Sequence, residues 1–207
     1  MTNFIEREQH GDHRITIYQD NDPHSPREDD NLGILVHWHR NYDLGDRRAE
    51  EVELDALRRG GWPLLTRYLR ATQGATGLLP VSLLDHSGLH IWVSGGTHWS
   101  DTQGWDSGPV GFIYTTPERR KIIGGVPASP DNTWIDNCLR AEVETYDQYL
   151  RGDVYGYVVE RIVSCDHGDE HAEVIDSCWG LYGSDMDYCK EKARRSLPAS
   201  VGEGVPA

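Results

Sequence analysis

Seven short runs of β-branched and aromatic residues constrain the fold more than any other feature of this sequence. Each run is bounded by Gly, Pro, Asp or Ser, which is typical of strands that end in turns. The runs cover residues 14–18, 33–39, 78–84, 89–94, 109–115, 154–164 and 172–179. Asp85–Gly88 separates two of them as a tight turn. We therefore expect about seven strands, several of them in hairpins.

Four helical patterns interrupt these runs. The strongest covers about residues 130–151, where apolar side chains recur at helical spacing from Ile135 to Leu150 and Gly152 ends the pattern. The others cover residues 47–59, with Asp46 as the cap, 63–72 and 185–196. Because the helices are inserted rather than alternating regularly with single strands, the pattern predicts an α+β fold. We expect a mainly antiparallel sheet of about seven strands with about four inserted helices.

A chain of 207 residues fits one domain. We expect a single α+β domain over residues 1–197 and a flexible C-terminal tail over residues 198–207. The N-terminal residues lack the pattern of a signal peptide, and no apolar run reaches the roughly 18 residues of a membrane helix. The four cysteines are unevenly spaced, which is typical of reduced thiols. These features predict a cytoplasmic protein that does not bind membranes.

The charge is strongly negative and unevenly distributed. The chain has 34 Asp and Glu against 20 Lys and Arg, and residues 141–189 hold twelve carboxylates against two arginines. Such a balance repels nucleic-acid phosphates and anionic lipids, so direct nucleic-acid binding is not expected. A rigid acidic surface can instead imitate a phosphate backbone or attract a basic partner. The alternative is a solvated face that keeps the protein soluble. The candidate partner-binding residues are Glu142, Glu144, Asp147, Asp153, Glu160 and Asp176.

Three histidines suggest a metal site. In residues 33–39 the period of two places His37 and His39 on the face opposite Val36, and Asp43 follows closely. A His-x-His strand with His90 from a neighbouring hairpin could bind a divalent metal. The alternative is exposed histidines on the solvated face of a half-buried strand. No other cofactor is expected.

The segment Asp106–Pro109 is similar to the surroundings of a serine nucleophile. Pro109 has no N–H to offer an oxyanion, and the chain lacks a Gly-x-Ser-x-Gly elbow. Ser107 is therefore expected in a turn that leads into a strand.

A third group of ligand types lies between residues 165 and 178. Cys165, His167, His171 and Cys178 could bind zinc, but they lack the usual Cys-x-x-Cys pairing. A solvated polar hairpin loop is the expected structure.

Six segments carry a resemblance to a known family. They are residues 30–33 (DNLG), 39–46 (HRNYDLGD), 85–88 (DHSG), 105–114 (WDSGPVGFIY), 142–160 (EVETYDQYLRGDVYGYVVE) and 176–183 (DSCWGLYG). Over roughly residues 15–185 the chain resembles uncharacterised proteins carried by bacteriophages and prophages. The resemblance implies a phage accessory protein in the bacterial cytosol and assigns no catalytic residue.

Charge and resemblance together predict a non-enzymatic protein that binds a basic surface of a host nucleic-acid-binding defence protein, in the manner of a nucleic-acid mimic. The alternative is a metal-dependent enzyme or a metal-stabilised module that uses His37, His39 and His90. A virion or scaffold component is a third possibility.

Overall fold

The computed structural model describes residues 4–94, 106–127, 130–164, 169–183 and 186–198. The chain divides into two compact units, unit 1 (residues 1–24 and 152–207) and unit 2 (residues 25–151). The described residues form nine strands in two sheets and four α-helices, which confirms the α+β prediction. The domain predicted over residues 1–197 thus comprises two compact units, and the predicted tail lies outside the described residues from residue 199 on.

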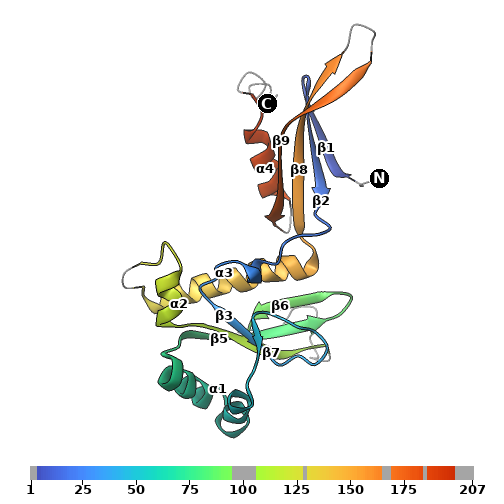
Figure 1. Cartoon of the computed structure of the whole chain (residues 1–207). Coiled ribbons are helices and arrows are strands. Elements are labelled where there is room, and N and C mark those ends of the chain that lie inside the picture. Colours follow the sequence, from blue (N-terminus) through green and yellow to red (C-terminus); the bar gives the residue numbers. More distant parts are fainter. Residues whose placement is uncertain (1–3, 95–105, 128–129, 165–168, 184–185, 199–207) are drawn as a thin grey trace. The chain divides into compact units, whose positions relative to one another are not determined.

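Unit 1 is an antiparallel sheet with a helix on one face (Figure 1). Its strands are β1 (Phe4–His10), β2 (His13–Gln19), β8 (Val154–Ser164) and β9 (Glu170–Tyr182), in the order β1-β2-β8-β9. Helix α4 (Asp187–Arg195) buries Cys189 and Ala193 against Ile17, Tyr157 and Val159. The helix is also held by ion pairs to β1, including Lys190 Nζ to Glu6 Oε2 at 2.7 Å.

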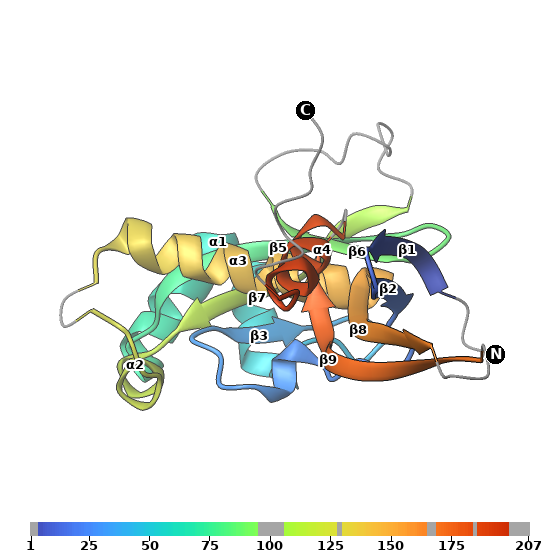
Figure 2. The same cartoon turned by 90° about the horizontal axis from the view of Figure 1, so that it is seen from above.

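The β8–β9 hairpin is the longest in unit 1, and β9 curves along its length (Figure 2). Two interruptions of the β8–β9 register, next to Tyr157 and Glu160, account for this curvature because bulges bend the strand that carries them. Gly156 lies under the Trp179 ring, where a Cβ would overlap the ring atoms. The missing side chain lets Trp179 lie against the sheet and stack on Tyr18, with ring centroids 5.8 Å apart.

Unit 2 has a five-stranded sheet between helices α1 and α3 (Figure 1). The strands are β3 (Ile34–His37), β4 (Arg47–Arg48), β5 (Thr76–Asp85), β6 (Leu89–Val93) and β7 (Ser107–Thr115). Their order is β4-β3-β7-β5-β6, and only the β3–β4 pair is parallel among the described strands. The predicted 78–84 and 89–94 hairpin is confirmed as β5 and β6.

The two faces of this sheet have separate cores. Helix α3 (Asn132–Arg151) packs Ile135, Leu139 and Val143 onto one face, as its helical spacing predicts. Helix α1 (Glu51–Gln73) packs Leu65 and Leu69 onto the other. The short helix α2 (Pro117–Ile122) follows β7, and a single 3-10 turn covers Pro26–Glu28.

Helix α1 joins the two helices predicted at 47–59 and 63–72. Gly61 takes φ 60° and ψ −158°, so the helix is kinked there rather than ended, and Pro63 lies in the first turn after the kink. The predicted cap at Asp46 is wrong, because the helix begins at Glu51 and the Glu53 carboxylate accepts a hydrogen bond from the backbone N–H of Glu50.

None of the helices in the described parts of the chain combines the length and the apolar character needed to span a membrane.

Candidate functional site

Glu142 is part of an internal ion network in unit 2. The Arg27 guanidinium, with a side chain only 3% exposed, binds the Asp46 carboxylate through two nitrogens at 2.6 and 3.0 Å. A third nitrogen of Arg27 lies 3.1 Å from Glu142 Oε2, and Glu142 also accepts the backbone N–H groups of Leu32 and Gly33. Burial raises the pKa of Glu142, and Arg27 opposes that shift. The Glu142 charge is therefore used to hold residues 27–33 against α3.

Asp147 has a similar internal role about one and a half turns later on α3. Its Oδ1 atom lies 2.5 Å from His90 Nδ1 and accepts the backbone N–H of Ile91 at 2.8 Å. The residue is buried and ties α3 to the edge strand β6. Glu144, three residues before Asp147, is exposed.

The other three predicted carboxylates lie in unit 1. Glu160 is 2.9 Å from Arg14 Nη2, across the β2–β8 pair. Asp176 accepts hydrogen bonds from the hydroxyls of Ser196 and Tyr157, which lower its pKa in that order of importance. Asp153 is half-buried beside the start of β8. The six predicted residues are thus divided between the two units, and four of them make internal contacts through their carboxylates.

The predicted histidine group does not assemble. His37 is buried, with Nε2 3.2 Å from Asp43 Oδ1, and desolvation lowers its pKa. His39 Nδ1 accepts the backbone N–H groups of Asn41 and Tyr42, and its ring stacks on Tyr42. His90 is bonded to Asp147. Among the described residues no three His, Cys, Asp or Glu side chains lie close enough to hold a metal ion.

The alternative to a metal site, in which His37 is exposed on a solvated face, is also wrong, because His37 is buried. Strand β3 is the second strand of the sheet, with α3 covering the face of Leu35 and α1 the face of Val36. By the period of two, His37 shares the face of Leu35. A strand covered on both faces buries the histidine as well as the apolar residues around it.

The hairpin loop for which we expect a polar, solvated structure, with zinc as the alternative, is only partly described. Cys165 and His167 lie outside the described residues. Cys178 packs against the unit 1 core that contains Cys189, and His171 lies 3.6 Å from Glu173. These two residues are engaged at different points of β9.

Ser107 begins β7, as its position after a turn predicts. It lines an open, polar depression of about 540 Å³ together with Trp38, His39, Asp85 and Asp106. The Asp106 carboxylate lies 3.1 Å from His86 Nδ1. In the part of the chain that the structure describes, no hydrogen bond joins the Ser107 hydroxyl to a histidine.

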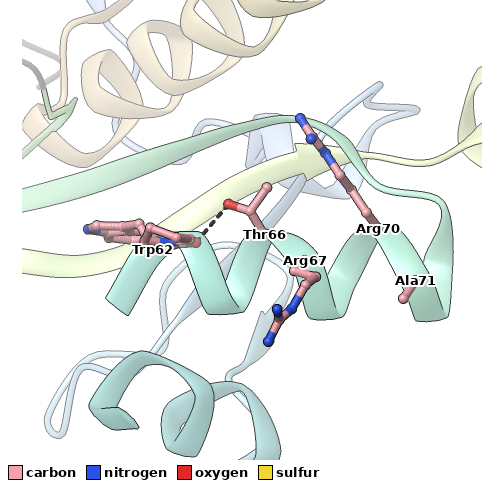
Figure 3. Close-up of a pocket in the computed structure, with 6 residues that line it drawn as sticks. Trp62, Thr66, Arg67, Arg70 and Ala71 are labelled. Atoms are coloured by element: carbon pink, nitrogen blue, oxygen red, sulfur yellow. Dashed lines mark hydrogen bonds between the residues drawn. The ribbon is translucent and has the colours of Figure 1, made fainter. Parts of the chain in front are cut away.

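A second depression, of about 740 Å³, lies along the outer surface of α1 and is lined by Trp62, Pro63, Thr66, Arg67, Arg70 and Ala71. The Thr66 hydroxyl donates to the Trp62 carbonyl, and Arg67 and Arg70 project in opposite directions (Figure 3). The two guanidinium groups do not converge on a common point, so this surface lacks the geometry of an anion site.

The first half of β9, in unit 1, is an exposed segment that carries two carboxylates. Residues 170–175 are all exposed, including the side chains of Glu170, Glu173, Val174 and Ile175. In the described sheet β9 is an edge strand that pairs only with β8. Glu170 and Glu173 are not among the six candidates, although the alternation in residues 169–177 (DEHAEVIDS) is a signal that both lie on a strand.

Comparison of the chain with protein-family models, curated proteins and solved structures found no match.

Proposed function

We propose that this chain is an acidic binding protein that engages a basic surface of a nucleic-acid-binding protein in the bacterial cytosol, as a nucleic-acid mimic. The observation that carries this proposal is the exposed first half of β9, where Glu170 and Glu173 lie on opposite faces of the strand, close to Val174 and Ile175. Carboxylates held on a fixed backbone attract Lys and Arg, and the adjacent apolar side chains add buried area on contact.

The internal contacts show which carboxylates have a structural role and which are left exposed to a partner. The carboxylates of Glu142 and Asp147 already bind Arg27, His90 and backbone N–H groups. Replacing Glu142 or Asp147 would therefore lower the stability of unit 2 before it changed the affinity for a partner. Glu173 lies 3.6 Å from His171, and its side chain is 58% exposed. Glu170 and Glu173 are therefore carboxylates that a partner can reach on the β8–β9 hairpin.

The resemblance to phage-carried proteins supports the cytosolic context of the proposal. A phage protein of this charge would meet host proteins whose surfaces are built to bind phosphates. The metal alternative has less support, because His37, His39 and His90 are engaged by three different neighbours.

The test is affinity capture with the full chain from nuclease-treated bacterial lysate at low salt, followed by competition. We expect capture of basic nucleic-acid-binding proteins, steep loss of binding as salt increases, and displacement of this chain by duplex DNA. The Glu170→Gln, Glu173→Gln double variant should bind more weakly, whereas Glu144→Gln should not. Binding that is insensitive to both salt and DNA would refute the mimicry.

A further inference from the structure

We propose that the outer edge of β9 accepts an added strand from its partner, and that this strand alternates basic with apolar residues. This inference rests on the proposed function and specifies how the partner is held. The edge is long, since β9 has 13 residues, and no described strand pairs with its outer side. Each free edge leaves a row of backbone N–H and C=O groups that another strand can satisfy.

The edge lacks three of the usual protections against such pairing. Natural edge strands are blunted by Lys, by Pro or by a covering helix, as well as by other charges and by bulges. The segment Glu170–Tyr182 contains neither Lys nor Pro, and α4 packs against the sheet face formed by Ile17, Tyr157 and Val159 rather than over the edge. β9 carries the extra residue of both bulges, so the regular part of its exposed edge is Glu170–Val174.

The two faces of β9 differ in chemistry at the exposed end. Residues paired across a sheet share a face, and Asp176 and Glu173 are opposite Val159 and Arg161. The acidic pair therefore lies on the face that carries α4. Ala172 and Val174 are opposite Ile162 and Glu160, on the other face, together with Glu170 opposite Ser164, and Val174 is 64% exposed.

An added strand would have its own side chains on the same two faces. On one face they would meet Glu173 and approach Asp176, and on the other they would lie beside Ala172 and Val174. In a strand in which Lys or Arg alternates with Val or Ile, the basic side chains would meet the carboxylates on one face and the apolar side chains would contact Ala172 and Val174 on the other. The period of two makes this match depend on residue order and not only on composition.

A second copy of this chain is a poor occupant for the same edge. In an antiparallel pair centred on Glu173, each Glu173 faces its own copy. Like charges that stand opposite each other destabilise the pair. The carboxylates thus discourage self-association while favouring a basic strand.

The experiment measures binding of the full chain to a capped peptide of about eight residues in which Lys alternates with Val. A control peptide has the same composition with all the Lys first, and a second control carries N-methyl groups on alternate amides. We expect the alternating peptide to bind at least about tenfold more tightly than either control. It should also slow amide hydrogen exchange along residues 171–176.

Reversing the charge of Glu173 distinguishes a lost contact with the added strand from a loss of binding caused by misfolding, because only a folded variant can bind a peptide of the opposite charge. Glu173→Lys should weaken the alternating peptide by about fivefold to thirtyfold and should bind a Glu/Val peptide instead. Glu144→Lys makes the same charge change on an exposed residue of unit 2 and should leave both affinities within about twofold.

Three results would overturn the inference. Equal binding of the block or N-methylated peptide would show general charge attraction, which leaves the proposed function intact. A lack of binding by the alternating peptide would exclude strand addition. The proposed function is tested separately, by the capture of folded nucleic-acid-binding proteins. Concentration-dependent dimerisation that protects residues 171–176 without peptide would make a second copy the occupant.

Discussion

Replacing Arg27 by Ala should destabilise unit 2 more than any other exchange of an arginine for alanine. Arg27 is the cation shared by Asp46 and Glu142, and it also donates to the Gly33 carbonyl at 2.9 Å. The carboxylates have side chains only 18% and 17% exposed, so removal of the guanidinium leaves two poorly solvated negative charges close together. Loss of one partner from a buried ion pair costs about 3–5 kcal/mol.

The size of this loss can be compared with the whole stability of the protein. A domain of this kind is stable by about 5–15 kcal/mol, so the variant would lose about a fifth or more of its unfolding free energy. Arg27→Lys should lose less, because it keeps the positive charge but not the two-nitrogen contact with Asp46. Arg40→Ala is the matched control, since Arg40 is exposed and forms no ion pair with a described residue; its effect should stay within about 0.5 kcal/mol.

Urea denaturation followed by tryptophan fluorescence is the suitable assay. Six of the seven tryptophans belong to unit 2, so the signal reports mainly on that unit. A further variant, Glu142→Gln, removes one charge but keeps an oxygen for the N–H groups of Leu32 and Gly33, so adding it to Arg27→Ala should restore part of the loss. An Arg27→Ala variant that unfolds within about 1 kcal/mol of the wild type would refute the reasoning.

Three further predictions concern packing and titration. Gly156→Ala should cost about 1–3 kcal/mol and disturb the Trp179 ring, because the new Cβ would overlap it; Gly108→Ala, with no atom within 4 Å, is the control, and near-ultraviolet circular dichroism measures the difference. The buried His37 stays neutral while the unfolded chain takes up a proton, so the unfolding free energy should fall as pH decreases below about 6.5. This part of the fall should be missing from His37→Phe, and identical pH slopes for variant and wild type would contradict it. Burial raises the pKa of the Cys189 thiol to about 11, so iodoacetamide at neutral pH should modify Cys189 only after denaturation, as peptide mass spectrometry can show.

Elements with a strong internal period can be predicted from the sequence. The apolar spacing predicts a helix over residues 130–151, and α3 covers Asn132–Arg151, because one continuous apolar stripe faces the sheet. Strand β1 is not predicted by its sequence. Lys190 and Arg194 of α4 neutralise Glu6 and Glu8, Arg7 donates to the Thr16 hydroxyl of β2, and these partners come from other parts of the chain. The pair Gly60–Gly61 predicts the end of a helix, but the structure has a kink at Gly61. A glycine pair in the sequence does not distinguish a helix end from a kink.

The roles of the α3 carboxylates can be read from their helical positions. Glu142 is three residues after Leu139 and Asp147 is four residues after Val143, so both lie beside the apolar stripe that these buried residues form. Glu144 lies away from the stripe and is exposed. What the period does not supply is the identity of the cation: Arg27 is 115 residues away from Glu142 along the chain, and only the tertiary fold brings them together.

Local charge density is therefore a poor guide to which carboxylates can meet a partner. A buried carboxylate must have compensating donors within the fold, so its charge is already balanced before any partner arrives. Glu142 and Asp147 satisfy that condition, whereas Glu170 and Glu173 are solvated and have no such requirement. The first pair determines whether unit 2 folds, and the second pair can contribute its electrostatic attraction to binding. Neutralising each pair should consequently change stability in one case and association rate in the other.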